Sequence, residues 1–235
     1  MRLLIACLFC GNMIAQTAIK LPVLESYSLS ISEPSDIAVS KDGKSLFIVS
    51  DDGALYETDL KGNSIRSITI GIIDAEAVYA DGEYVYVVEE RTRLIKQYSI
   101  KEFNLIRTIE IPYQGGRNKS FESLTKSSEN EWLLFTERDP IWMFQLNSSF
   151  EIINRIKWDV PGDVSAATWH KEKLWLLSDE LAEVWLTDVK SHSILKRFKL
   201  PVLNPEGIAF LPNGKMLIVS DDGHKLYVFD DPNLN

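Results

Sequence analysis

One pattern occurs five times along this chain and leaves few folds open. In each copy, a short apolar segment begins at an acidic or small polar residue. A strongly apolar segment follows and ends in acidic residues. The copies begin 40, 46, 43 and 41 residues apart, at Asp36, Glu76, Glu122, Ser165 and Glu206. A β-strand repeat of about 40–50 residues is typical of a propeller blade. We therefore predict an all-β, five-bladed β-propeller.

Each copy continues with two more segments of strand character. Third strands are expected at residues 54–60, 94–100, 141–146, 182–188 and 225–229, and fourth strands at 64–70, 105–111, 152–158 and 194–200. The fifth copy ends after its third strand, whereas residues 25–31 repeat the alternating fourth-strand pattern ahead of the first copy. We therefore expect four-stranded antiparallel blades, with this N-terminal strand pairing into the last blade and closing the ring.

Composition limits the classes of partner. The net charge of −9 argues against a nucleic-acid partner, which requires a basic face, and permits a cation or a basic partner. No run of 18 apolar residues occurs, so no transmembrane span is expected. The repeats fill the chain to its end, so we expect residues 19–235 to form one domain and the protein to be a monomer.

The N-terminus has the pattern of a targeting segment. Arg2 is followed by the apolar stretch Leu3–Phe9 and then by small residues such as Ala18, which predicts a secretory signal peptide over residues 1–18. The residues up to Cys7 also fit a lipoprotein cleavage box, with a lipid anchor on that cysteine. A further alternative is the N-terminal tail of a cytosolic protein. Both cysteines lie in this segment, so no disulfide or thiolate metal site is expected in the mature chain. We expect a periplasmic or secreted protein.

Acidic residues are expected to gather on one face of the ring. In an antiparallel blade the first strand begins on the face where the second strand ends. The four acidic first-strand residues Asp36, Glu76, Glu122 and Glu206 should therefore surround the mouth of the central channel. Carboxylates held this close repel one another unless they take up protons or share a cation. We predict calcium (Ca²⁺) with these four ligands, because calcium accepts six to eight oxygen ligands in irregular geometry. The ring has no histidine or cysteine, which argues against zinc, copper and iron.

A second acidic ring, farther out, has a structural alternative. Its members end the second strands and are Asp51, Glu89, Glu137, Asp179 and Asp221. Aspartate and serine side chains hydrogen-bond neighbouring backbone in ordinary turns, so we interpret these residues first as turn residues. The pairs Glu90–Arg91 and Glu137–Arg138 could be local ion pairs. The histidines fall in unrelated places and give no support to a hydrolytic triad.

The ordered set of motifs resembles a known family. The motifs are Asp74-Ala75-Glu76-Ala77-Val78 with Glu89-Glu90-Arg91, Ser120-Phe121-Glu122-Ser123-Leu124, Asp163-Val164-Ser165-Ala166-Ala167 and Asn204-Pro205-Glu206-Gly207-Ile208-Ala209. Together they resemble the SdiA-regulated family of bacterial exported proteins. The resemblance implies a five-bladed propeller, distantly similar to NHL-repeat proteins, with calcium near Glu76, Glu122 and Glu206. Asp36 departs from the family pattern, in which a small polar residue is more usual in the first blade. No reaction is implied.

Two functions are compatible with these patterns. The first is a non-catalytic, calcium-stabilised binding module of the cell envelope, with an unidentified small molecule or protein at the acidic face. The alternative is a calcium-dependent hydrolase of lactonase or esterase type, in which the metal polarises a carbonyl group. Asp163, Asp179 or Glu137 could then supply a general base. We favour the binding module, because the outer acidic ring can pair with Arg91 and Arg138.

Overall fold

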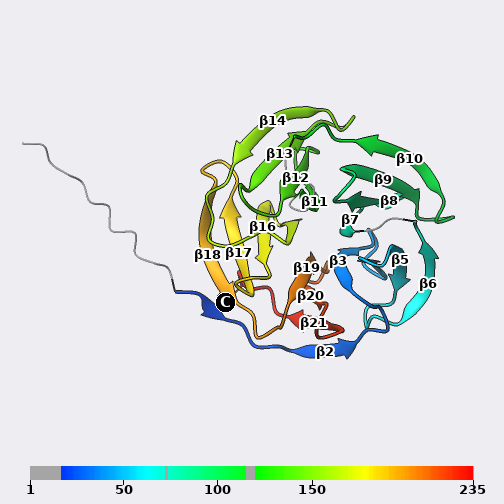
Figure 1. Ribbon diagram of the computed structural model, residues 1–235. Coiled ribbons are helices and arrows are strands. Elements are labelled where there is room, and N and C mark those ends of the chain that lie inside the picture. Colours follow the sequence, from blue (N-terminus) through cyan, green and yellow to red (C-terminus); the bar gives the residue numbers. More distant parts are fainter. Residues whose placement is uncertain (1–16, 72–73, 115–119, 235) are drawn as a thin grey trace, which may run out of the picture.

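The computed structural model describes residues 17–71, 74–114 and 120–234, and these form strands and no helix. Five sheets stand around a central axis, so the prediction of an all-β, five-bladed propeller is confirmed (Figure 1). No helix long and apolar enough to cross a membrane occurs among the described residues. The predicted signal segment falls almost entirely on residues 1–16, outside the described part of the chain, and it stays a prediction.

Each blade contains four antiparallel strands that run outward from the axis. The first strands are β3 (Pro34–Val39), β7 (Ala75–Ala80), β11 (Phe121–Lys126), β15 (Ala166–His170) and β19 (Pro205–Phe210). The second strands are β4 (Leu46–Ser50), β8 (Tyr84–Glu89), β12 (Trp132–Thr136), β16 (Lys173–Ser178) and β20 (Met216–Ser220). The third are β5 (Ala54–Thr58), β9 (Leu94–Ser99), β13 (Trp142–Leu146), β17 (Glu183–Asp188) and β21 (Lys225–Phe229). The outer strands, on the rim in Figure 1, are β6 (Ser64–Thr69), β10 (Leu105–Glu110), β14 (Ile152–Lys157), β18 (Ser193–Lys199) and β2 (Glu25–Ser28).

The N-terminal segment closes the ring. Strand β2 pairs antiparallel with β21, from Glu25 opposite Val228 to Ser28 opposite Lys225, which confirms the expected closure. The ladder is shorter than the expected 25–31, although the Leu29 N–H still donates to the His224 carbonyl at 2.8 Å. A two-residue strand, β1 (Ile19–Lys20), pairs in parallel with β18 and extends the fourth blade. Two residues carry no readable periodicity, so β1 was not expected.

The C-terminal segment makes a second link between the last two blades. After β21 the chain turns so that Asp231, with 1% of its side chain exposed, accepts a hydrogen bond from Lys171 Nζ at 2.7 Å. Lys171 follows β15 of the fourth blade. The neighbouring His170 ring stacks on Phe210 of the fifth blade, with centroids 4.1 Å apart. Both chain ends therefore hold the fifth blade against the fourth.

Apolar side chains fill the spaces between blades. The core consists of five clusters, and each cluster joins residues of two neighbouring blades. Between the second and third blades, Tyr86 packs against Trp132, and Trp132 stacks on Phe150 with centroids 4.7 Å apart. The most deeply buried tryptophans include Trp158, Trp175 and Trp185. This burial supports the interpretation of the tryptophans as blade-packing residues.

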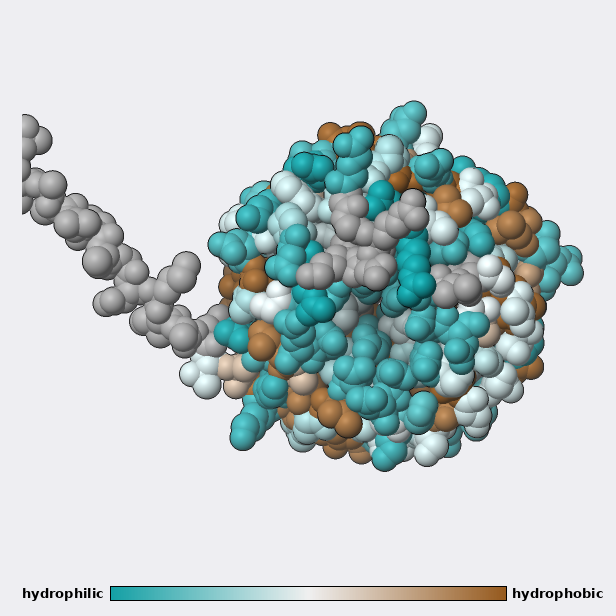
Figure 2. Space-filling model, viewed as in Figure 1, coloured by the Kyte–Doolittle hydropathy of each residue, from teal (hydrophilic) through white to brown (hydrophobic). Residues whose placement is uncertain are grey.

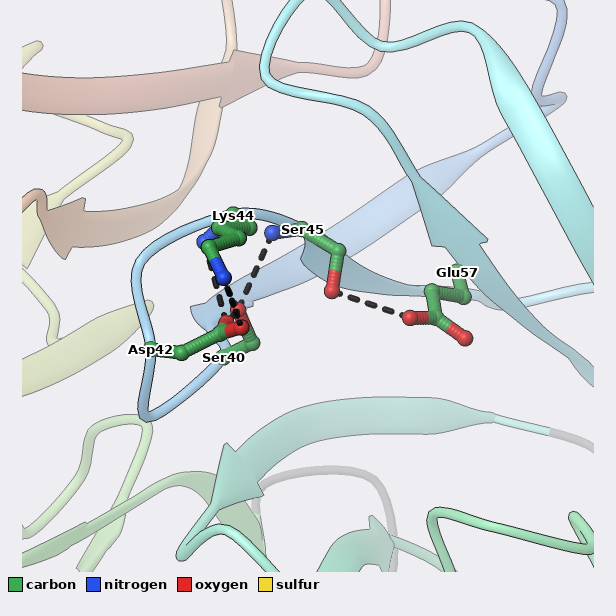
Figure 3. Close-up of polar contacts among 5 residues, drawn as sticks. All are labelled: Ser40, Asp42, Lys44, Ser45 and Glu57. Atoms are coloured by element: carbon green, nitrogen blue, oxygen red, sulfur yellow. Dashed lines mark hydrogen bonds and ion pairs between the residues drawn. The ribbon is translucent and has the colours of Figure 1, made fainter.

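Polar side chains hydrogen-bond within their own turns on the face where the first strands end. In the turn between β3 and β4, Ser40 Oγ accepts hydrogen bonds from the N–H groups of Lys44 (3.1 Å) and Ser45 (3.0 Å) and donates to Asp42 (2.8 Å) (Figure 3). Ser45 Oγ donates to Glu57 at 2.9 Å. A short polar side chain that bonds its own turn is ordinary turn chemistry. Asp42, the acidic residue of this turn, also accepts a hydrogen bond from the Lys44 N–H at 3.2 Å.

Removal of β2 should destabilise the ring strongly, because it exposes the edge of β21 and reopens the closure. We expect a chain lacking residues 1–32 to lose its cooperative thermal transition, or to melt far below the chain that lacks only residues 1–18. A chain lacking residues 1–22, which loses β1 and keeps β2, should fall between them. Differential scanning calorimetry tests the series. A chain without residues 1–32 that melts like the chain without residues 1–18 would contradict this role.

Candidate functional site

The glutamates of the channel mouth lie on β-bulges. In β7 the pairing passes from Ala75 opposite Glu89 to Ala77 opposite Val88 and leaves Glu76 unpaired. The same irregularity leaves Glu122 unpaired in β11 and Glu206 unpaired in β19. A bulge bends the strand and redirects the side chain of the extra residue. The three glutamates therefore occupy one equivalent position, where the first strands begin. Ser165 precedes Ala166 in the fourth blade and takes the same place without a bulge.

The first blade places Ser35, and not Asp36, at this position. Strand β3 has the same bulge, and the residue it leaves unpaired is Ser35, because Asp36 pairs with Val49. Asp36 is thus equivalent to Ala77 and Gly207. The expectation that Asp36 aligns with the glutamates was wrong by one residue. The small polar residue that the family resemblance implies in the first blade is present, as Ser35.

Asp36 instead ties three first strands together. It is 4% exposed, and its carboxylate accepts hydrogen bonds from the N–H groups of Ile37 (2.7 Å) and Val78 of β7 (2.8 Å). A third backbone hydrogen bond comes from Ile208 of β19. The strands approach so closely here that a Cβ atom on Gly207 would lie 2.7 Å from the Asp36 Cα. Only glycine fits that position, and the Asp36 carboxylate is committed to backbone donors.

The outer acidic ring also differs by one residue in the second blade. Backbone N–H groups at the ends of the second strands donate to carbonyls that precede the first strands. The donor–acceptor pairs are Asp51 to Glu33, Glu90 to Asp74, Glu137 to Ser120 and Asp221 to Asn204. Glu90 is therefore the equivalent of Asp51, and the expectation of Glu89 was wrong. The Glu89 carboxylate lies 3.5 Å from Lys96 Nζ on the neighbouring strand.

A third set of polar residues lies two positions before the mouth residues Ser35, Glu76, Glu122, Ser165 and Glu206. Its members are Glu33, Asp74, Ser120, Asp163 and Asn204. Glu33, Asp74 and Asn204 adopt positive φ angles of 44°, 62° and 45°, a region in which aspartate and asparagine are several-fold enriched. The sequence carries this signal, because each residue stands two places before a glutamate or serine of the mouth. Glu33, Asp74 and Asp163 add three carboxylates to the acidic face.

Carboxyl groups of these sets meet in pairs. Glu90 accepts a hydrogen bond from the Ser120 N–H at 2.7 Å and is also hydrogen-bonded to the carboxyl of Glu122. Burial and then the charge of Asp74 raise the pKa of Asp51, and the contact between the two carboxyls adds to this shift. Asp179 is hydrogen-bonded to Asp163, which also accepts from Ser178 Oγ. Two carboxyl groups can share such a bond only when one of them carries a proton. Carboxyl pairs of this kind therefore favour either retention of a proton or the binding of a cation between them.

Burial and mutual repulsion raise the pKa values of the glutamates. Burial, followed by the charge of Asp51, raises the pKa of Glu76 to about 8. Burial, followed by the charge of Asp179, raises the pKa of Glu206 to about 9. The pKa of Glu122 is raised well above its ordinary value by burial and then by the charge of Glu76. Glu206 also contributes to the shift of Glu122, so the three carboxyls act on one another.

The residues present fit a hard cation. Asp51, Asp74 and Glu76 each offer one carboxylate oxygen, and these oxygens lie within 4.8 Å of one another. Asp51 Oδ1 is buried with no hydrogen-bond donor against it. A neighbouring pocket of about 270 Å³ is lined by Glu33, Pro34, Ser35, Asp51, Glu76, Glu206 and Asp221. Hydrophilic residues also gather over the middle of the ring face in Figure 2. A donor set made of oxygen atoms suits calcium and other hard cations.

Two arginines neutralise part of the outer acidic ring. Arg138 Nε lies 2.8 Å from the Glu137 carboxylate, as expected, and Arg138 also pairs with Glu180. Arg91 was expected to pair with Glu90, but its ion pair is with Asp74. These pairs lower the charge at the rim. Among the described residues no ion pair involves Glu76, Glu122 or Glu206, so no cationic side chain offsets the mutual repulsion of these three carboxyls when they ionise.

The metal-free protein should lose stability as the pH rises from 5 to 9. Glu76 and Glu206 have folded-state pKa values of about 8 and about 9, against an ordinary value of 4.5. The folded chain therefore binds more protons than the unfolded chain over this interval, and the free energy of unfolding falls with pH. Urea denaturation in the presence of a chelator measures it. The double variant Glu76→Gln/Glu206→Gln should show a flatter profile. A wild-type stability that rises between pH 5 and 8 would contradict this prediction.

Comparison with solved structures shows the same fold at low identity. Myxococcus xanthus glutaminyl cyclase is similar with a TM-score of 0.74 and 12% identity, over 90% of this chain and 97% of that chain. Kuenenia stuttgartiensis hydrazine synthase gives 0.53 and 14%, over 81% and 56% of the two chains. A Bacteroides caccae protein of unknown function gives 0.57 and 12%, over 79% and 70%. At such identities these likenesses establish the fold alone.

Comparison at the level of sequence identifies the family. A search of curated proteins finds no match. The model of the SdiA-regulated family matches residues 28–234, which spans all five blades and begins within the closing strand β2. The match includes Ser35 and the three bulge glutamates. The chain therefore belongs to the SdiA-regulated family of β-propellers.

Proposed function

We propose that this protein is a calcium-binding β-propeller that acts as a binding module of the bacterial cell envelope. The observation that carries the proposal is the position of Glu76, Glu122 and Glu206 on equivalent bulges at one channel mouth. Their raised pKa values show that the metal-free mouth is unfavourable for full ionisation. A calcium ion at the mouth would allow the carboxylates to ionise together.

The ligand set we propose differs from the sequence-based set in two ways. Asp36 is left out, because its carboxylate is occupied by backbone N–H groups of neighbouring blades. Asp51 and Asp74 are added beside Glu76, because their oxygens lie within 4.8 Å of one another. Such a set spans several blades, so calcium would also hold those blades together.

The binding role follows from the form of the acidic face. Calcium takes six to eight oxygen ligands, and a partner can supply some of them through carboxylate or carbonyl groups. The pocket beside Glu76 and Glu206 leaves room for such a group. We therefore propose an oxygen-rich small molecule or a protein carboxylate as the ligand at this face, with the ion as the contact between them.

Export to the cell envelope is part of the same proposal. Its support is the apolar stretch Leu3–Phe9 after Arg2 and the restriction of both cysteines to this stretch and the residue that follows it. Extracellular and periplasmic calcium concentrations suit weak sites with dissociation constants of about 10⁻⁴–10⁻³ M, which are typical of extracellular modules. Lipid attachment at Cys7 would place the ring at a membrane surface.

Calcium should raise the melting temperature in a concentration-dependent manner, because it binds the folded form alone. Magnesium should do less, since it requires a small octahedral site and loses water reluctantly. Glu122→Gln keeps the shape and removes one charge, so it should weaken calcium binding while the metal-free variant stays at least as stable as wild type. Calorimetric titration and thermal melting measure both effects.

The matched control is Glu151→Gln, which removes one charge from an exposed residue bonded to Asn147 at 2.7 Å in a turn of the opposite face. This control should bind calcium like wild type. Equal melting curves with calcium and with chelator, or equal calcium affinity of Glu122→Gln and wild type, would refute the proposed site.

One observation favours calcium-dependent ester or lactone hydrolysis as a second candidate. Burial, followed by a hydrogen bond that the protonated Asp179 carboxyl donates to Asp163, raises the pKa of Asp179 to about 7, close to the optimum for a general base near neutral pH. Asp179 also lies near enough to contribute to the raised pKa of Glu206. A bound calcium ion would polarise the carbonyl of the substrate. Asp179 would accept the proton of the attacking water.

If this second candidate is correct, a panel of chromogenic esters and lactones should be hydrolysed only with calcium present. The variant Asp179→Asn should then reduce kcat by roughly 10²–10⁴-fold, the usual contribution of a general base, while leaving calcium affinity near wild type. Glu151→Gln again serves as the control. Hydrolysis that proceeds unchanged in chelator, or in Asp179→Asn, would exclude this mechanism.

A further inference from the structure

The face opposite the acidic mouth carries a second pocket, between the third and fourth blades. It has a volume of about 650 Å³, within the range of small-molecule sites. Its walls come from the β11–β12 turn, the β15–β16 turn and the segment after β17. We propose that this pocket binds an organic cation with an apolar stem, such as an alkylamine or the side chain of a lysine or arginine.

The charge of the pocket favours a cation. Four carboxylates line it (Glu129, Glu131, Glu172 and Asp188), against two ammonium groups (Lys173 and Lys190). Within the described part of the chain, no ion pair involves Glu129, Glu131 or Glu172. The Asp188 carboxylate is engaged by its own turn, where it accepts from the Lys190 N–H at 2.8 Å. The four carboxylates exceed the two ammonium groups by two, so the lining carries a net negative charge that attracts a positive group.

The floor of the pocket favours an apolar stem beside that charge. Ile156 and Val189 form part of the lining and are only partly buried, so they present apolar surface to the pocket. Trp169, on β15, forms part of the wall and is only partly buried. Tryptophan is the best aromatic partner for a cation, and its ring also covers an aliphatic stem. A metal ion would gain nothing from these apolar groups, whereas an alkylammonium or guanidinium group uses both parts of the pocket.

The pocket is separate from the proposed calcium site. Its walls begin where the first strands end, whereas the acidic mouth lies where those strands start. Trp169 also lines the central channel, so the pocket adjoins the far end of that channel. Binding in the pocket therefore does not depend on calcium, and experiments in chelator separate the two proposals.

The test uses three probes and calorimetric titration in a chelating buffer at low salt. The probes are pentylamine, the blocked peptide acetyl-Leu-Lys-Leu-amide and the same peptide with an acetylated lysine. The first two should bind, and the acetylated peptide should bind at least tenfold more weakly, because acetylation removes the charge and keeps the stem. Tighter binding of the peptide than of pentylamine identifies a protein segment as the source of the cation, and the reverse identifies a free amine.

Two variants locate the binding. Glu131→Gln/Glu172→Gln should weaken both cationic probes by roughly five- to tenfold, as expected for two exposed charge pairs. Trp169→Phe keeps an aromatic ring and should weaken them by a smaller factor. Glu151→Gln, on the same face but outside the pocket, should bind like wild type. Equal affinity of the acetylated peptide, equal loss in the control, or binding of a neutral sugar in place of the amines would overturn the proposal.

Discussion

The convergence of five first strands on one axis is the constraint on which the rest of this structure depends. The strands approach so closely that one carboxylate, that of Asp36, accepts hydrogen bonds from β3, β7 and β19 at once. Gly207 supplies the space for this contact. The same convergence brings Glu76, Glu122 and Glu206 within electrostatic reach of one another. The geometry that closes the ring thus also creates its acidic mouth.

The fold could be predicted from the sequence because the β-strand pattern recurs five times at a nearly constant spacing. The three glutamates could be predicted because glutamate is unusual at a strand start and recurs there. The register could not, since a bulge adds one residue that no periodicity reveals. Spacing alone therefore places Asp36 at the bulge position that Ser35 occupies. In the same way it places Glu89 at the strand end that belongs to Glu90. The role of Asp74 depends on spatial proximity to Asp51, which residue spacing does not show.

The acidic mouth lowers the stability of the fold when its carboxyls ionise. Two unit charges about 4 Å apart repel by roughly 1–4 kcal/mol at effective dielectric constants of 80 to 20, so the metal-free mouth opposes folding when it ionises. The raised pKa values of Glu122 and Asp179 favour retention of protons on these carboxyls, which relieves part of this cost. The two chain ends compensate at the ring closure, through β2 on β21 and through Asp231 on Lys171. The contacts that close the ring therefore offset the charge repulsion at its mouth.

The channel below the mouth separates the two faces chemically. Its volume is about 150 Å³, and most of the residues that line it are apolar in type, among them Ile37, Val78 and Leu124, so backbone groups supply much of its polar surface. Thr125 is one of the few polar residues in this lining. Its Oγ1 already accepts a hydrogen bond from the backbone N–H of Trp169 at 3.0 Å. None of the described residues that line the channel is acidic, so an ion that left the mouth for the channel would gain no carboxylate ligand in place of those it gave up. A cation at the mouth must therefore enter and leave through the acidic face, where a bound partner would control its exchange.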